Sequence, residues 1–183
     1  MADLFCDSVA GEFTELLCGT ETGRIVALGL VDPSWVDGQS PAFDPEVDAS
    51  WTSGEAASPR THWIINGGVR GEMPRATDTE EEGFGLDTTQ LTGAEHTATL
   101  QIKGIEGNVD FSNIVNRKKW YVALVTSSGD NDLMYWIEVP VTVIFRAVVP
   151  NDIKSSQYWE VTLKWTTLDN PADKTTPDSL KPV

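Results

Sequence analysis

The sequence predicts a mainly β protein, an antiparallel β-sandwich or barrel with one short flanking α-helix, long loops and extended termini. From Glu95 to Leu168, short apolar and β-branched runs are separated by polar turn signals roughly every ten residues. The segment from Asp32 to Ala94 has little periodicity and many glycines, prolines and acids. A segment of that length without regular structure is usually functional, disordered or held by a partner.

The first strand is expected at Arg24–Val31, an apolar run bounded by a glycine and by an Asp-Pro stop. Before it, residues 1–20 mix acids with apolar side chains and are predicted to form an N-terminal arm. The arm precedes a single β domain over residues 21–168, in which residues 32–94 form a long loop-rich insertion.

Within the insertion, a short strand is expected near Val47–Thr52 and another at His62–Ile65. The triplet Asn66-Gly67-Gly68 predicts a turn, because Asn and Gly tolerate positive φ. The acidic run Glu80-Glu81-Glu82 is interpreted as part of a solvated loop.

The second half is more regular. Glu95–Lys103 alternates apolar and polar residues, which is typical of a half-buried strand. A helix over about Asp110–Lys119 follows, because Asp110 can cap it and basic residues are favoured near a helix C-terminus. Pro140 predicts a bulge or sheet edge, since proline donates no hydrogen bond to a ladder. The last residues, 169–183, are expected to form a flexible C-terminal tail. The remaining strands are expected at Trp120–Val125, Leu133–Val139, Val141–Val149 and Tyr158–Thr166.

Charge is distributed unevenly along this acidic chain of 183 residues, whose formal net charge is −15. Residues 1–90 hold 17 acids and 4 bases, whereas residues 91–183 hold 11 acids and 9 bases. The excess acid either keeps the protein soluble or has a function of its own. In both cases it repels the phosphates of nucleic acids and anionic membranes, so sequence-specific DNA or RNA binding is not expected. No signal peptide and no membrane-spanning apolar run are expected either.

No recognisable catalytic motif occurs in the sequence. His62 and His96 are the only histidines, and with Cys6 and Cys18 their spacing matches no compact zinc pattern. We therefore expect buried or solvated polar side chains at these positions, no metal, no cofactor and no enzymatic activity. Two free thiols are the default, and a disulfide between Cys6 and Cys18 is the alternative. The turn Asp130-Asn131-Asp132 begins like a calcium loop but lacks the glycine and the glutamate that such a loop requires.

The chain contains seven tryptophans. We expect core or inter-sheet packing for the four that lie in predicted strands, Trp120, Trp136, Trp159 and Trp165. The other three lie in or beside the loop-rich part and are candidate inter-subunit anchors or sugar-stacking platforms, because large aromatic residues are enriched at interfaces. These three are Trp35, Trp51 and Trp63.

The layout resembles that of tail tube and related virion structural proteins of long-tailed bacteriophages. The resemblance rests on the arm Cys18-Gly19-Thr20-x-Thr22-Gly23-Arg24 leading into the first strand and on the strand Glu95–Lys103 followed by the helix Asp110–Lys119. It rests further on the hairpin Trp120–Val139 and on the closing strand at Tyr158 before a proline-containing tail. It covers residues 18–31 and 95–170 and is one of layout, without a diagnostic motif.

The resemblance implies a virion protein made in the host bacterial cytoplasm, whose partners are copies of itself and other virion proteins. The copies would form a homo-oligomeric ring, for which a hexamer is one option, and stacked rings would conduct DNA without binding it specifically. An acidic lumen would repel the DNA backbone. Candidate lumen acids are Asp44, Glu46, Asp48, Glu80, Glu81 and Glu82. Two alternatives stay open: a capsid decoration or head-tail completion protein, and a carbohydrate-binding β-sandwich.

Overall fold

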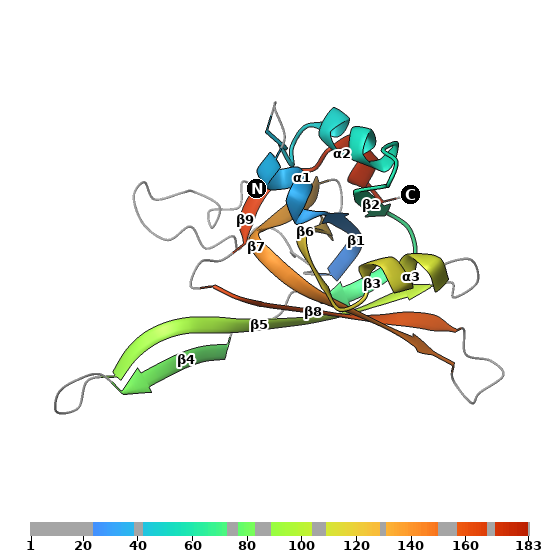
Figure 1. Cartoon of the computed structure of the whole chain (residues 1–183). Coiled ribbons are helices and arrows are strands. Elements are labelled where there is room, and N and C mark those ends of the chain that lie inside the picture. The colour runs from blue at the N-terminus through green and yellow to red at the C-terminus, as the bar shows by residue number, and fades with distance from the viewer. Residues whose placement is uncertain are drawn as a thin grey trace, which may run out of the picture.

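Six antiparallel strands close into a barrel in the computed structural model (Figure 1). Their order is β1-β3-β5-β8-β7-β6, and β6 closes the ring by pairing with β1. The structure describes residues 24–38, 42–72, 77–82, 89–103, 109–128, 131–149, 157–167 and 171–182. The predicted N-terminal arm, with Cys6 and Cys18, lies outside these residues. The described strands are β1 Arg24–Val31, β2 His62–Ile65, β3 Val69–Glu72, β4 Thr77–Glu82, β5 Thr89–Lys103, β6 Lys118–Ser128, β7 Asn131–Val148, β8 Tyr158–Thr166 and β9 Ala172–Thr175. The described helices are α1 Pro33–Gly38, α2 Asp48–Glu55, α3 Val109–Val115 and the 3-10 helix η1 Asp178–Leu180.

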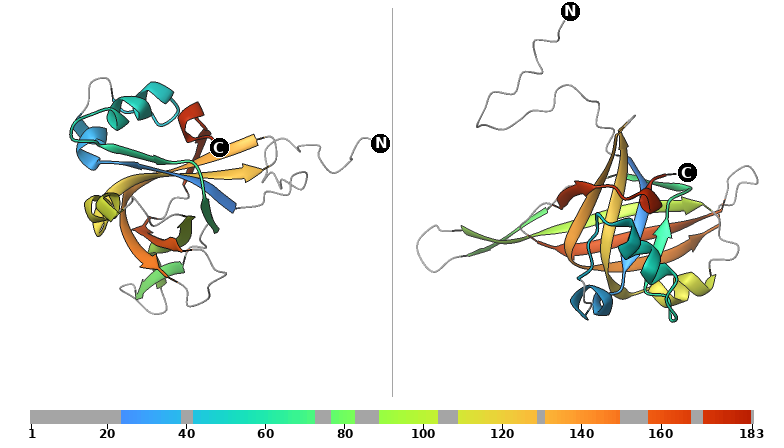
Figure 2. Two further views of the ribbon diagram at one scale, coloured as in Figure 1. Left: turned by 90° about the vertical axis from the view of Figure 1, so that its right-hand side faces the viewer. Right: turned by 90° about the horizontal axis from the view of Figure 1, so that it is seen from above.

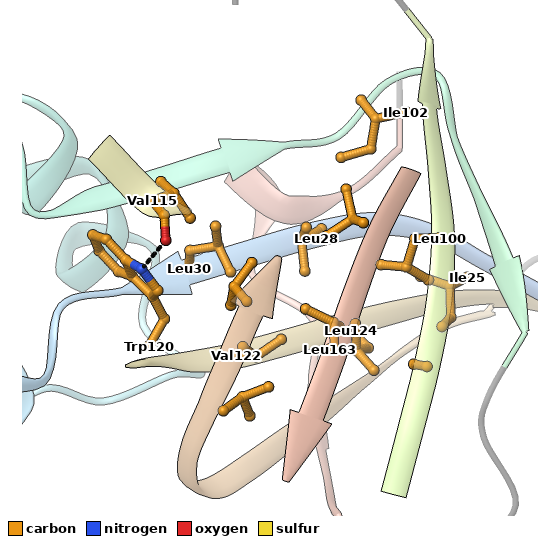
Figure 3. Close-up of a cluster of buried hydrophobic side chains, with 14 of the residues drawn as sticks. Ile25, Leu28, Leu30, Leu100, Ile102, Val115, Trp120, Val122, Leu124 and Leu163 are labelled. Atoms are coloured by element: carbon orange, nitrogen blue, oxygen red, sulfur yellow. Dashed lines mark hydrogen bonds between the residues drawn. The ribbon is translucent and has the colours of Figure 1, made fainter. Parts of the chain in front are cut away.

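The barrel interior is filled by one side of each strand (Figure 3). On β6, Trp120, Val122 and Leu124 are buried there. The indole N–H of Trp120 donates a hydrogen bond of 3.1 Å to the carbonyl oxygen of Val115, which ties α3 to the barrel. Burial of this apolar surface is the main stabilising contribution to the fold.

A second core lies outside the barrel, between its wall and the segments that cover it. Alternate residues of β6 point to this side, including the buried Ala123 and Val125. Because both faces of β6 are covered, its sequence is almost continuously apolar. Figure 2 shows α1, α2 and the C-terminal segment on the same side of the barrel.

One interrupted strand replaces the chain reversal expected at Asn66-Gly67-Gly68. The segments β2 and β3, on either side of this triplet, both pair antiparallel with β1. Gly68 has a φ of 70°, as the composition of the triplet predicted, and its carbonyl oxygen accepts a 3.0 Å hydrogen bond from the Lys103 N–H. The expected turn is therefore a bulge that separates β2 from β5, whereas β3 pairs with β5.

The bulge expected at Pro140 is confirmed. Trp120 pairs with Val141, but Val122 pairs with Ile137, so the register between β6 and β7 shifts beside the proline. The chain does not end a strand there, and the two predicted strands form the continuous β7. Residues from Asn131 to Val143 pair with β6, those from Leu133 to Trp136 also pair with β9, and those from Thr142 to Val148 pair with β8.

The predicted helix Asp110–Lys119 is confirmed in position but ends earlier, at Val115. Arg117 has a φ of 61°, which ends the helix, and its N–H donates a 2.8 Å hydrogen bond to the Val143 carbonyl. Lys118 then begins β6. The basic residues near its C-terminal end favoured a longer helix, but pairing with the barrel decides where the helix ends.

Regular structure occupies much of the region expected to be a loop-rich insertion. The strand expected near Val47–Thr52 is wrong, because this segment begins α2. Helix α2 is only weakly amphipathic, and its stability comes from burying Trp51 completely against the barrel. Gly29 of β1 makes room, since a Cβ there would lie 2.6 Å from the Trp51 ring.

The expectation of a flexible tail over residues 169–183 is wrong for 172–180. Strand β9 pairs antiparallel with the first half of β7, and Leu180 of η1 is fully buried in the outer core. Two prolines flank η1 and limit its length. A helix this short leaves no periodic pattern of apolar residues in the sequence. The C-terminal segment thus completes the cover over the barrel wall.

Candidate assembly surface and barrel-end cavity

A long hairpin extends from the closed barrel (Figure 1). Its two strands, β4 and the first part of β5, pair from Thr77↔Glu95 to Glu82↔Thr89. The second part of β5, from Glu95 to Lys103, pairs with β8 and belongs to the barrel wall. Among the described strands, β4 pairs with β5 alone. Its outer edge therefore presents a backbone that can pair with another chain.

The six predicted lumen acids fall into two separate groups. Glu80, Glu81 and Glu82 lie in strand β4 of the hairpin, not in the loop expected for them. Asp44, Glu46 and Asp48 lie at and before the start of α2, on the far side of the barrel (Figures 1 and 2). One copy of the chain therefore does not bring the six acids together.

The acids near α2 hold the C-terminal segment. Glu46 accepts a 2.9 Å hydrogen bond from the Thr175 N–H of β9, and its other carboxylate oxygen lies 3.9 Å from the ammonium of Lys174. The pKa of Glu46 is lowered, chiefly because of the hydrogen bond from the Thr175 backbone. Asp48 accepts a 2.7 Å hydrogen bond from the Ser179 N–H. These contacts give Glu46 and Asp48 a role within the monomer.

The three candidate anchor tryptophans have different environments. Trp51 is fully buried, and its indole N–H donates a 2.9 Å hydrogen bond to the Pro45 carbonyl, so its assignment as an inter-subunit anchor is wrong. Trp35 and Trp63 are partly exposed and pack against the outer core and the barrel core, respectively. The size of a tryptophan and its position in a predicted loop did not distinguish a buried residue from one that is exposed at the surface.

Both histidines are buried. His62 is fully buried beside the rings of Trp35, Phe43 and Trp51, with centroid distances of 5.3, 5.3 and 6.1 Å. Desolvation lowers the pKa of His62 to about 4, although its contacts with the Gly54 backbone and Asp32 oppose this shift. The imidazole is therefore neutral at neutral pH.

His96 stacks on Trp165 with their ring planes 4° apart, and its Nε2 lies 3.4 Å from the Thr167 carbonyl oxygen. Within the described residues, no three His, Cys, Asp or Glu side chains gather in a way that could hold a metal ion.

A cavity of about 400 Å³ lies where β5 ends and β8 begins. It is at the opposite end of β5 from the hairpin, and it forms because β2 diverges from β5 after the bulge. Four of its lining residues make a continuous aromatic chain, with centroid distances of 4.7, 5.1 and 6.3 Å between successive rings. In order, these rings belong to Trp63, Phe111, Phe145 and Trp159.

Two cations lie at this cavity. The guanidinium of Arg60 stacks 4.4 Å from the centroid of the Trp63 ring. It also donates a 2.8 Å hydrogen bond to the His62 carbonyl and forms an ion pair with Glu55. Lys103 also lines the cavity, and its side chain is exposed. Sequence reasoning missed this site because its residues come from distant segments. Of the lining residues, only Trp63 was considered a candidate for binding.

No protein-family model, curated protein or solved structure matches this chain. The helices in the described part of the chain are all too short or too polar to cross a lipid bilayer. The fold, the charge distribution and the surfaces described above therefore carry what can be inferred about the function of this protein.

Proposed function

We propose that this protein is a structural subunit of a bacteriophage virion, most specifically a tail tube subunit that assembles into stacked rings around an acidic lumen. The observation that carries the proposal is the hairpin of β4 and β5, which leaves a closed barrel and exposes an unpaired backbone edge among the described strands. The closed barrel has no edge of its own, and among the described strands outside it β4 offers the longest edge, six residues against four in β2 and four in β9.

The geometry also favours head-to-tail assembly. The hairpin extends from one end of β5, and the other end of β5 lies in the barrel wall. Contacts between unlike surfaces generate closed rings when the rotation between copies closes. The net charge of −15 supports a lining that DNA slides past without binding. Glu80–Glu82 remain the candidate lumen acids, because Asp44, Glu46 and Asp48 all accept hydrogen bonds inside the monomer.

Assembly is tested by sedimentation velocity over a concentration series, followed by negative-stain imaging. The proposal expects rings or tubes at high concentration. In a trimmed variant, an Asn-Gly turn replaces residues 80–92, since Thr79 and Gly93 are paired and this turn joins paired strands. Trimming should leave the barrel folded by near-UV circular dichroism but abolish assembly. A full-length chain that stays monomeric up to its solubility limit would contradict the proposal.

A second experiment tests the acidic lining by comparing two variants in which different acids are neutralised. The triple variant Glu80→Gln, Glu81→Gln and Glu82→Gln should assemble normally, and its tubes should retain more DNA on co-sedimentation. A control variant neutralises three exposed acids elsewhere and should behave like the unmodified chain. Equal DNA retention by both triple variants would remove the lumen role but leave the assembly proposal standing. The control changes are Glu72→Gln, Glu138→Gln and Asp178→Asn.

The two alternatives give different results in the same assays. A capsid decoration or head-tail completion protein would bind phage heads without forming tubes. A carbohydrate-binding role now rests on Trp35 and Trp63, because Trp51 is buried. Saturable glycan binding that is lost on changing either exposed residue would favour that role.

A further inference from the structure

The cavity at the end of β5 has the features of a small-molecule site. Its volume of about 400 Å³ is within the range of about 300–1,000 Å³ that is usual for ligand pockets. The aromatic chain from Trp63 to Trp159 supplies flat apolar walls on which a planar group can stack. Aromatic walls with a few convergent polar groups are the usual composition of such sites.

The polar groups at the cavity favour an anion. Arg60 and Lys103 line it, and none of the described lining residues is acidic, although the chain as a whole is strongly acidic. Glu55 pairs with Arg60, so the Lys103 ammonium is the cation left without an ion pair among the described residues. A negative group on a ligand would meet this ammonium at the cavity rim.

Two hydrogen-bond donors at the same place lack acceptors. The indole N–H groups of Trp63 and Trp159 are buried and have no partner among the described residues. Trp159 is only 7% exposed, so bulk water does not replace the missing acceptor. A buried donor without an acceptor destabilises the folded protein, and a ligand oxygen that reached either indole on local rearrangement of the lining would relieve that cost.

We propose that this cavity binds a planar aromatic anion, whose ring lies against the aromatic chain and whose carboxylate or similar group faces Lys103. The site is complete in one copy of the chain, so it does not depend on the assembly proposed above. It would give the protein a ligand-dependent state, with the bound ring joining β2, α3, β7 and β8.

The test uses 1-naphthoate as the probe and 1-naphthylmethylammonium as a probe with the same ring and opposite charge. Binding is followed in ¹H–¹⁵N spectra through the indole Nε1 signals, which single Trp→Phe variants assign. Naphthoate should shift the Trp63 and Trp159 signals saturably and leave those of the other five tryptophans in place. The cationic probe should bind at least about tenfold more weakly, because its ammonium meets that of Lys103 and no carboxylate among the described lining residues.

A matched pair of lysine variants tests the anionic contact. Lys103→Gln should weaken naphthoate binding by about tenfold, whereas Lys164→Gln, an exposed lysine outside this cavity, should not change it. Dispersed amide spectra show that each variant is folded. Absence of a saturable shift, or shifts spread over all seven indoles, would overturn the proposed site. Equal binding of both probes would overturn its preference for anions.

Discussion

The burial of His62 makes the stability of the protein depend on pH in a defined range. Desolvation lowers its pKa to about 4 in the folded state, against about 6.5 in an unfolded chain. The unfolded state therefore binds the proton more tightly, and stability falls as pH drops from about 6.5 to about 4. The loss is complete below the lower value, and the stabilising effect is fully present above the higher one.

The size of the effect follows from the two pKa values. Between pH 7 and pH 5, linkage gives a loss of about 2 kcal/mol from this group. Extending the range to pH 4 raises the loss to about 3 kcal/mol. These are large fractions of a typical folding free energy of about 5–15 kcal/mol.

Urea unfolding at pH 7 and pH 5 measures this contribution when the chain is compared with a His62→Phe variant. Phenylalanine keeps a ring that can stack on Phe43, which lies 5.3 Å from His62, but it cannot take up a proton. Losses from the carboxylates are common to both proteins and cancel in the difference. The variant should lose about 2 kcal/mol less stability than the unmodified chain. Equal losses in both proteins would show that His62 is not buried in its neutral form.

Three further changes test the packing around the barrel wall. Gly29→Ala should cost about 1–3 kcal/mol in urea unfolding, since the added Cβ would lie 2.6 Å from the ring packed above it. The control Gly67→Ala meets no atom within 4 Å and should stay within about 0.5 kcal/mol of the unmodified chain. Leu180→Ala should cost about 2–5 kcal/mol, because this fully buried side chain would leave a cavity; a neutral result would mean that η1 does not pack there. Glu46→Ala should raise the hydrogen-exchange rate of the Thr175 amide, because it removes the carboxylate that accepts the hydrogen bond from this N–H, and unchanged protection would refute that contact.

Sequence patterns predicted the strands best where one face of a strand is polar. The alternation in Glu95–Lys103 and Tyr158–Thr166 places both segments in strands that pair with each other, although β5 begins six residues earlier than expected, at Thr89. Pro140 correctly marked a bulge, because its missing N–H acts locally. In these cases the signal depends on neighbours in the sequence.

The sequence did not reveal elements that depend on distant contacts. Helix α2 exists because Trp51 finds a space above Gly29, and β9 exists because β7 extends beyond its pairing with β8. Neither fact leaves a local periodicity. The aromatic cavity was missed for the same reason, since Arg60, Phe111 and Trp159 are brought together only when the barrel closes.

The continuity of β5 has a mechanical consequence. The strand that forms the hairpin is the same strand that pairs with β8 from Glu95 to Lys103. A pull on the hairpin along its length therefore acts parallel to β5, and it loads this whole row of backbone hydrogen bonds in shear. Bonds loaded together resist extension far better than bonds that open one at a time, so tension applied at the tip is borne by the barrel wall as a unit.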